Sequence, residues 1–432
     1  MTMGSALKAK AFLRRHGLSP AALDVAAVQA SFLSEMEAGL AGQPSSLAMI
    51  PTYVTIDKPV PANTPVTVMD AGGTNLRVGT VRFSTAGVPE ITDFRKFPMP
   101  GVGAYASKDD FFASLAEALR PVAGASSRIG FCFSYATQIT PDCDGKLLYW
   151  TKEIQAPDVV GTFVGAELNR KLAAVGCGGK RIVILNDTIA TLLAGKSFGA
   201  ARRYENYTGV IVGTGSNTAY VEDNSRITKL PGLPPGAMAI NLESGGFGKC
   251  PRSDFDTMLD ATLANPGRQS FEKMISGGYL GGVALHVLRA AAFEGLLSPA
   301  AGAVMGTWQD LPTKDLDGLL ANPFQAGPFA QAAFTSADLE MMMLLCAEVV
   351  RRAAVLIAIN ISTPVIKTGS GKNPLHPVGI TVDGSTYYKT TNLKSQVEEN
   401  LRHILGRRGV HFEILKIDEA PLIGAAVAGL TL

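Results

Sequence analysis

The 432-residue sequence lacks the patterns that mark a disulfide scaffold or a metal centre. Its five cysteines are an odd number without paired spacing, which argues against a disulfide framework and for a reducing compartment. The five histidines lie far apart along the chain, so neither a zinc site nor a histidine-based mechanism is indicated. We therefore expect a cytoplasmic protein.

Long apolar stretches and runs of one charge are also missing. The most hydrophobic segment, residues 341–361, is interrupted by Glu348, Arg351 and Arg352, which predicts a buried helix and not a membrane span. The 39 basic and 37 acidic residues are dispersed, and a net charge of +2 indicates neither a nucleic-acid nor a membrane partner. We expect small-molecule partners, and a monomer or a homodimer.

The length and the periodicity that are present predict a mixed α/β protein. A chain of 432 residues is long for one core and suggests two domains, or one large domain with a satellite. Strand patterns are found at 66–70, 76–83, 91–97, 128–134, 181–185, 209–222, 378–388 and 410–417. Helical spacing is found at 20–40, 108–119, 162–172, 188–196, 253–287, 337–361, 393–405 and 422–430. This order favours two similar α/β halves that face one cleft.

The most informative feature is a glycine turn that follows a strand pattern ending at Asp70. We call it the first glycine turn, and it consists of Gly72, Gly73, Thr74 and Asn75. Adjacent glycines allow successive backbone N–H groups to point at an anion, and the threonine and asparagine add uncharged donors. Asp70 can hold a hydrated magnesium ion beside bound phosphates. An ordinary β-hairpin turn has the same pattern.

A second unit of the same plan lies at residues 209–222, where a strand, a glycine turn with threonine and asparagine, and another strand follow one another. We call its turn the second glycine turn, and it consists of Gly213, Thr214, Gly215 and Ser216. The chain therefore carries two candidate phosphate sites. The segment 369–372, Gly-Ser-Gly-Lys, is not a P-loop, because the earlier glycine is missing and Asn373 replaces serine or threonine.

Eight segments together resemble a known family. They are SLAMIPTYV at 46–54, DAGGTNLRV at 70–78, FCFSYATQITPDCDGKLLYWTK at 131–152, LNDTIATLLAG at 185–195, GVIVGTGSNTAYVE at 209–222, INLESGGFG at 240–248, FEKMISGGYLG at 271–281 and ITVDGSTYY at 380–388. In this order, and over most of the chain, the sequence resembles the hexokinases, which are sugar kinases of the actin-like ATPase fold. The resemblance implies an α/β, two-domain, ribonuclease H-like fold with a cleft between its domains.

The resemblance also implies how the chain is divided and what it does. The small domain would comprise residues 65–185 and 418–432, and the large domain residues 1–64 and 186–417. The implied activity is transfer of the γ-phosphoryl group of Mg-ATP to the 6-hydroxyl of glucose, with fructose and mannose as further acceptors. This reaction is the first step of glycolysis, and we expect sugar binding to close the cleft and exclude water.

Asp187 is the general base that the resemblance implies for the sugar hydroxyl. From its position alone, an N-cap of the helix predicted at 188–196 is the favoured role. The implied sugar-binding residues are Ser134, Thr151, Lys152, Asn186, Asp187, Glu243 and Glu272. Taken singly, the charged ones could be solvated surface residues, Asn186 and Ser134 turn formers, and Thr151 an ordinary strand residue.

The implied nucleotide site consists of the two glycine turns with Asp383 and Gly384, and Asp70 would hold magnesium through water. An Asp-Gly pair is also a common tight-turn signal, so the role of Asp383 and Gly384 stays open. Arg77 is expected to brace the first glycine turn.

Three segments depart from the family pattern. Ser244 follows Glu243 where tryptophan is usual, Ala136 follows Ser134-Tyr135 where proline usually follows Phe-Ser-Phe, and residues 418–426 replace a turn rich in glycine and serine. These differences bear on the choice of hexose and nucleotide more than on the reaction. Two other functions remain to be separated by experiment. A non-catalytic sugar sensor would not need the phosphate turns, and an assembly ATPase would polymerise without requiring sugar.

Overall fold

The computed structural model describes residues 3–150, 154–198, 202–324 and 327–432. Its strands are β1 Ile50–Pro51, β2 Val66–Ala71, β3 Asn75–Phe83, β4 Pro89–Pro98, β5 Arg128–Phe133, β6 Ala136–Ile139, β7 Gly145–Tyr149, β8 Arg181–Leu185, β9 Asn206–Val212, β10 Ser216–Asp223, β11 Ala237–Asn241, β12 Val378–Asp383 and β13 Phe412–Leu415. Its helices are α1 Met3–Arg15, α2 Val25–Leu40, α3 Lys108–Leu119, α4 Val164–Ala174, α5 Asp187–Phe198, α6 Asp254–Thr262, α7 Glu272–Ile275, α8 Leu280–Phe293, α9 Pro299–Gly306, α10 Thr313–Ala321, α11 Ser336–Thr368, α12 Ser385–Lys389, α13 Leu393–Gly406 and α14 Ala420–Thr431.

Two sheets of the described chain have the same arrangement of antiparallel and parallel strands. The five-stranded sheet has the order β4-β3-β2-β5-β8, in which β2 pairs antiparallel with β3 and parallel with β5, and β5 pairs parallel with β8. The six-stranded sheet has the order β1-β11-β10-β9-β12-β13, in which β9 pairs antiparallel with β10 and parallel with β12. Each sheet thus continues from an antiparallel hairpin into parallel strands, which confirms the expected α/β class.

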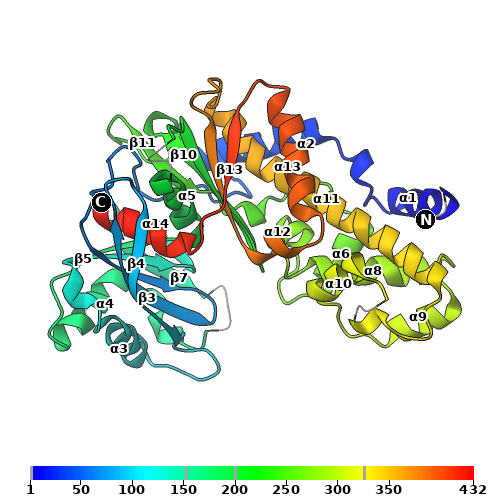
Figure 1. Ribbon diagram of the computed structural model, residues 1–432, viewed down its shortest axis with the longest axis horizontal. Coiled ribbons are helices and arrows are strands. Elements are labelled where there is room, and N and C mark those ends of the chain that lie inside the picture. Colours follow the sequence, from blue (N-terminus) through cyan, green and yellow to red (C-terminus); the bar gives the residue numbers. More distant parts are fainter. Residues whose placement is uncertain (1–2, 151–153, 199–201, 325–326) are drawn as a thin grey trace.

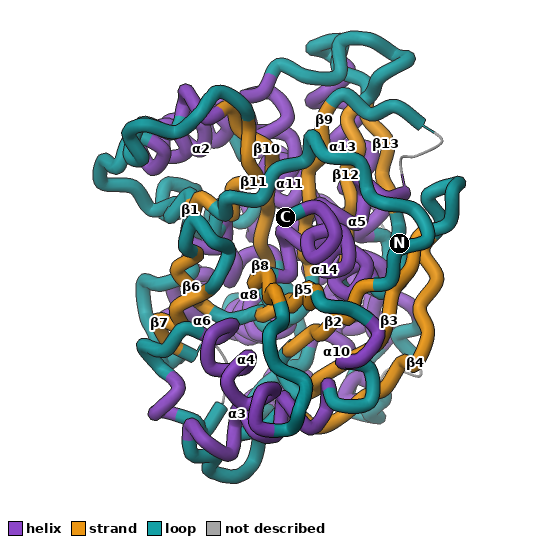
Figure 2. The backbone as a smooth tube through the Cα atoms, turned by 90° about the vertical axis from the view of Figure 1, so that its left-hand side faces the viewer, coloured by secondary structure: helices purple, strands orange, loops and turns teal. Residues whose placement is uncertain are grey.

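Helices α5 and α14 lie between the two sheets in Figure 1, and Figure 2 shows them near the centre of its view. α14 packs against β2 and β5, α5 packs against β9 and β12, and the two helices pack against each other. Their close approach requires glycine. A Cβ at Gly130 would lie 1.8 Å from the Ala425 carbonyl oxygen, and a Cβ at Gly424 would lie 1.8 Å from that of Ala190. The small residues of α14 therefore set how near the helix lies to its neighbours.

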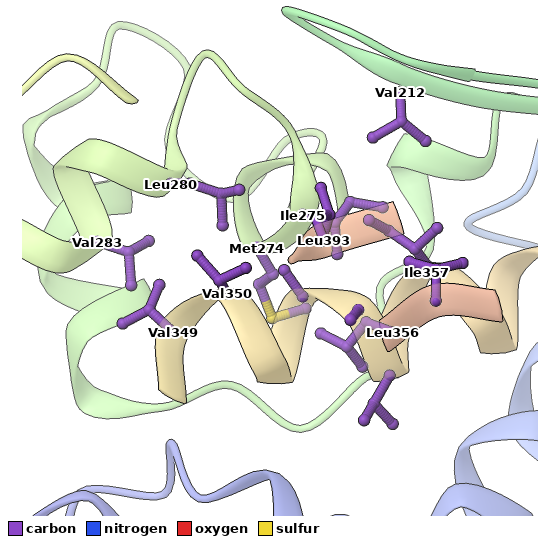
Figure 3. Packing of buried hydrophobic residues seen from close by; sticks show 14 of the residues in the cluster. Val212, Met274, Ile275, Leu280, Val283, Val349, Val350, Leu356, Ile357 and Leu393 are labelled. Carbon is purple, nitrogen blue, oxygen red and sulfur yellow. The ribbon is translucent and has the colours of Figure 1, made fainter. Parts of the chain in front are cut away.

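The largest apolar core surrounds α11. This 33-residue helix begins with a capping box formed by Thr335 and Asp338. Figure 3 shows Val349 and Val350 of α11 facing side chains from α7 and α8. In the part of the chain that the structure describes, we find no helix with the length and apolar character that crossing a bilayer requires.

Several expected elements differ in extent. α2 begins at Val25, because Asp24 caps it by accepting a hydrogen bond from the Ala27 amide. α1 was not among the expected helices. Asp383-Gly384 links β12 to α12, so the strand pattern expected at 378–388 is wrong beyond Asp383, where the chain enters a helix. All five cysteines are free thiols.

Candidate active site

Three parallel strands bring predicted site residues to one edge of the five-stranded sheet. Asp70 on β2 is opposite Cys132 on β5, and Cys132 is opposite Leu185 on β8. Because parallel strands end at the same edge, the residues that follow them lie close together. These are Ser134 after β5, and Asn186 and Asp187 after β8. Burial raises the pKa of the Cys132 thiol, and the charges of Asp70 and Asp187 raise it further.

Asp70 is almost completely buried and is paired with Arg77 on the neighbouring strand. The Arg77 Nη1 donates to Asp70 Oδ2 over 3.0 Å, and the same nitrogen lies 3.8 Å from Glu419 Oε2. Glu419 precedes α14 in a left-handed conformation with a φ of 52°. Arg77 therefore holds the base of the first glycine turn close to the segment where the sequence departs from the expected glycine and serine.

The first glycine turn joins β2 to β3, and those strands pair antiparallel. The hairpin alternative is therefore correct as topology, and it is compatible with a phosphate-binding role. The Gly72 amide donates to the Asn75 carbonyl over 3.1 Å, and the Met99 amide donates to the Thr74 carbonyl over 3.1 Å. The Tyr135 hydroxyl donates to the Gly72 carbonyl over 2.5 Å.

The second glycine turn joins β9 to β10 and is bound by several neighbouring groups. The Ser216 amide donates to Glu272 Oε2 over 2.8 Å. The Thr386 hydroxyl and the Gly277 amide each donate to the Gly213 carbonyl over 2.8 Å. Thr386 belongs to the helix that follows Asp383 and Gly384. The segment 380–388, which is predicted to belong to the nucleotide site, therefore lies against this turn. Gly384 itself has a φ of 117°, and a Cβ there would lie 2.2 Å from the Val212 carbonyl oxygen.

Asp187 is the first residue of α5, and its neighbour provides the cap. Asn186 Oδ1 accepts a hydrogen bond from the Thr188 amide over 2.8 Å, the usual geometry of an N-cap side chain. Asp187 Oδ1 accepts from the Thr188 hydroxyl over 3.2 Å, and Asp187 is partly exposed. The capping role that was open for Asp187 is therefore taken by Asn186.

Glu243 lies in a buried polar network at the end of β11. Asn241 Nδ2 donates to Glu243 Oε1 over 2.7 Å, and Asn217 Nδ2 donates to Asn241 Oδ1 over 2.7 Å. Burial raises the pKa of the Glu243 carboxyl, the hydrogen bond from Asn241 lowers it, and the charge of Asp187 raises it. Glu243 also has a φ of 55°, a conformation that costs about 1–3 kcal/mol and occurs often at functional sites.

A small cavity of about 20 Å³ adjoins this network. Its polar lining includes Asn186, Asn241 and Glu243, and its remaining wall is formed by Ile50, Thr52, Phe133, Tyr135, Thr137, Ile139, Ile184 and Leu185. Ser244, which stands where the family has tryptophan, is fully buried and is not part of this lining.

Electrostatic interactions connect the two sheets across the site. Burial raises the pKa of Asp383, the charges of Asp187 and Glu419 raise it too, and Arg77 lowers it. Asp383 ends a strand of the six-stranded sheet, whereas Asp187 and Arg77 come from the five-stranded sheet or follow it. The predicted base, Asp187, and the predicted nucleotide residue Asp383 are therefore near enough for the charge of one to shift the pKa of the other.

Most predicted site residues lie in the described chain, but Thr151 and Lys152 lie outside the described residues. Sequence reasoning missed three residues of the site: Asn217, Asn241 and Tyr135. Asn241 precedes Glu243 by two positions. Because side chains two positions apart in a strand lie on the same face of the sheet, the sequence could have indicated that Asn241 belongs to the site. Asn217 follows the second glycine turn, but its contact with Asn241 depends on the pairing of β10 with β11.

Two sheets of like topology, each with a glycine turn, and the helices α5 and α14 packed between them are features of the two-domain actin-like ATPase fold. A solved hexokinase from Schistosoma mansoni complexed with glucose superimposes with a TM-score of 0.80, at 26% sequence identity and 99% coverage of both chains. Two sequence models of the hexokinase family match residues 8–197 and 207–431. The chain belongs to the hexokinase family, which consists of sugar kinases that phosphorylate an alcohol acceptor.

Curated relatives match over different lengths. Hexokinase-7 of Oryza sativa subsp. japonica is 32% identical over 96% of this chain and 95% of its own length. Hexokinase-1 of the same organism is 36% identical, over 66% of this chain and 60% of its own length. The chain thus spans less than two thirds of the second relative.

Proposed function

We propose that this protein is an ATP-dependent hexokinase that transfers the γ-phosphoryl group of Mg-ATP to the 6-hydroxyl of glucose, with fructose and mannose as further acceptors. The observation that carries the proposal is the position of Asp187 directly after β8, at the edge of the five-stranded sheet where Asp70 and Ser134 also lie. The charge of Asp187 raises the pKa of Cys132 in the five-stranded sheet, of Glu243 in the buried polar network and of Asp383 at the end of β12. The same carboxylate therefore acts on residues of the predicted sugar and nucleotide sites.

Asp187 would accept the proton of the 6-hydroxyl as that oxygen attacks the γ-phosphorus. Its position at the start of α5 is fixed by the Asn186 cap, and the Thr188 hydroxyl bonded to Oδ1 orients the carboxylate. A positioned base of this kind contributes about 10²- to 10⁴-fold to rate. The remaining stabilisation of an in-line phosphoryl transfer comes from positioning and from dipoles and cations at the phosphate oxygens.

The sugar would be recognised by hydrogen bonds to its ring hydroxyls. Glu243 supplies a carboxylate whose orientation is fixed by Asn241, and Asn217 is bonded to the Asn241 amide in turn. We assign the sugar contacts to Ser134, Thr151, Lys152, Asn186, Asp187, Glu243 and Glu272, and add Asn217. Burial makes such contacts selective. A sugar that lacks one of the hydroxyls would leave a buried polar group of the protein without a partner, which is costly.

The nucleotide phosphates would lie between the glycine turns and meet their backbone N–H groups, with Asp383 and Gly384 beside the adenosine. Among the described residues, no three side chains of His, Cys, Asp or Glu form a group that could hold a metal ion. The residues fit a magnesium ion that takes most of its ligands from water and nucleotide phosphates, with Asp70 as an outer partner. Bound there, magnesium would neutralise charge on the transferred phosphoryl group.

We further propose that sugar binding closes the cleft and that the domains are residues 65–185 with 418–432, and residues 1–64 with 186–417. The packing of α14 against β2 and β5 supports the assignment of the C-terminal segment to the small domain. Closure would exclude water, which otherwise competes as phosphoryl acceptor. The free thiols of all five cysteines are compatible with the cytoplasmic location that we propose.

One coupled assay tests the function. ADP formation is measured with glucose, fructose, mannose or no sugar, and with ATP or pyrophosphate as donor. We expect turnover with ATP that depends on an added hexose, with a low rate of hydrolysis in its absence. Equal rates with and without sugar contradict closure, and sugar binding without turnover identifies a sensor.

A further inference from the structure

Tyr135 belongs to residues 131–152, which the resemblance assigns to sugar binding and which we call the sugar segment, and it contacts the first glycine turn. Its side chain is 3% exposed, and its hydroxyl donates to the Gly72 carbonyl over 2.5 Å. Burial raises the pKa of this phenol and the charge of Asp70 raises it further, so the hydroxyl remains a proton donor across the physiological range.

The ring of Tyr135 is fixed within the sugar segment. It packs edge-on against Trp150, with ring centroids 4.7 Å apart, and against Phe133 at 4.8 Å. Trp150 is itself anchored, because its Nε1 donates to the Ala156 carbonyl over 2.8 Å. Trp150 directly precedes Thr151 and Lys152, and Tyr135 directly follows Ser134. A shift of the sugar segment would therefore carry the ring with it.

The other end of the contact is the first residue of the first glycine turn. The Gly72 amide bonds within the turn to Asn75, whereas the Gly72 carbonyl accepts from Tyr135. The orientation of this carbonyl fixes the peptide plane between Gly72 and Gly73, and so the direction of the Gly73 amide. That amide is one of the groups expected to meet a phosphate.

We propose that Tyr135 is a positioning residue whose hydroxyl transmits the state of the sugar segment to the first glycine turn, so that hexose binding raises the affinity for nucleotide. The proposal rests on the proposed hexokinase function. The Tyr135 hydroxyl departs from the family pattern, because the resembling motif usually has Phe-Ser-Phe where this sequence has Phe133-Ser134-Tyr135. The ring keeps the packing, and the added oxygen supplies the link.

The test is Tyr135→Phe, which removes the oxygen and keeps the ring. We expect the KM for Mg-ATP to rise about threefold to tenfold, the effect of one hydrogen bond, while the KM for glucose stays within about twofold. Titration with a non-hydrolysable ATP analogue, with and without glucose, should show tighter binding with sugar in the wild-type protein and a smaller ratio in the variant. Tyr105→Phe is the matched control, because it removes a hydroxyl that donates to Asp158 from a side chain 62% exposed.

The outcomes separate this inference from the proposed function. If the wild-type protein shows no hexose-dependent ATP turnover, the function itself is wrong. If turnover is normal but Tyr135→Phe keeps the wild-type nucleotide affinity and sugar ratio, the inference is wrong. Equal weakening of both substrates with a lower melting temperature also overturns it, since that result indicates a structural role.

Hydrogen–deuterium exchange of the wild-type protein provides a measurement that does not depend on the variant's folding. Saturating glucose without nucleotide should slow exchange in residues 70–77 as well as in residues 131–139. Slower exchange in 131–139 alone would contradict transmission between the two segments.

Discussion

Among the described residues, the first glycine turn is bonded to two neighbouring segments, through Met99 and Tyr135, whereas the second is bonded to three. The second turn is bonded to Glu272 of α7, to the Gly277 and Gly278 amides and to Thr386 of α12. The first turn has its internal bond from Gly72 to Asn75, one backbone bond from Met99 and the Tyr135 hydroxyl. The same sequence plan is thus supported in different ways.

This difference has a functional meaning. Donors that are already fixed need no rearrangement when a charged group arrives, so the second glycine turn is preorganised for phosphate. Both turns contact a segment proposed to bind sugar, the first through Tyr135 and the second through Glu272. Because the first turn has fewer hydrogen bonds to its neighbours among the described residues, we expect its geometry to respond more to the acceptor. Substitutions at the two turns should therefore have unequal effects on nucleotide binding. Substitution of the proposed base, Asp187, should have the largest effect on turnover.

Asp187→Asn tests the proposed general base, whose function neither glycine turn can supply. We expect kcat to fall by about 10²- to 10⁴-fold, because the amide cannot accept the hydroxyl proton, while glucose affinity changes only a few-fold. The measurements are steady-state kinetics and direct titration with glucose. Asp142→Asn, which changes an exposed carboxylate bonded to Thr140, is the control. Retention of wild-type kcat in Asp187→Asn would mean that another group is the base.

Gly215→Ala and Gly72→Ala compare the turns directly. A Cβ at Gly215 would lie 2.6 Å from Glu272 Oε2, and the carboxylate would have to leave the Ser216 amide. A Cβ at Gly72 would meet nothing nearer than the Asn75 carbonyl oxygen at 3.7 Å. Loss of a hydrogen bond to a charged group costs about 1.5–3 kcal/mol, so we expect the KM for Mg-ATP to rise about tenfold or more in Gly215→Ala.

Gly72→Ala should stay within about twofold of the wild-type KM, because the added methyl group fits without displacing a hydrogen-bonding partner. Melting temperatures of both variants identify any global loss of structure. Equal increases in KM would show that the two turns are supported alike and would remove the basis of the comparison.

Much of this architecture could be predicted from local patterns, because local interactions determine it. Helix α3 occupies residues 108–119 as predicted, since Ser107 caps it and its apolar residues recur at helical spacing. Helix α11 was predicted to end at 361, but it continues through Pro364 to Thr368. The Thr363 hydroxyl donates to the Ile359 carbonyl there, and the surrounding core stabilises a helix that the proline alone would interrupt.

The remaining features depend on contacts between distant segments. α1 buries Ala9, Phe12 and Leu13, too few apolar residues to give a clear sequence pattern. The contact of Tyr135 with Gly72 joins residues 63 positions apart, and it exists because β2 and β5 are neighbours in the sheet. The carboxylate of Asp187 was identified by resemblance, but the Asn186 cap that fixes it became evident from geometry.

His16→Gln provides a reference for the comparison, because His16 directly follows α1, which lies at the opposite end of the molecule from the five-stranded sheet (Figure 1). His16 Nδ1 lies 2.8 Å from Asp254 Oδ2, and Nε2 lies 2.7 Å from Glu294 Oε1. Burial lowers the pKa of His16, but the two carboxylates outweigh it and the net pKa is raised. The imidazolium therefore joins α1 to α6 and α8.

A histidine whose folded pKa is raised stabilises the protein fully below its unfolded pKa of about 6.5, and the contribution is lost as pH rises through the folded pKa. We expect the melting temperature of the wild-type protein to exceed that of His16→Gln by about 1–3 °C at pH 6, and by less at pH 9. The KM values for both substrates should be unchanged at either pH. A difference in melting temperature that grows toward pH 9 contradicts the charged contact. A change in the KM for nucleotide would mean that substitutions near α1 affect the glycine turns, and that the difference between the two turns is not determined by their local contacts.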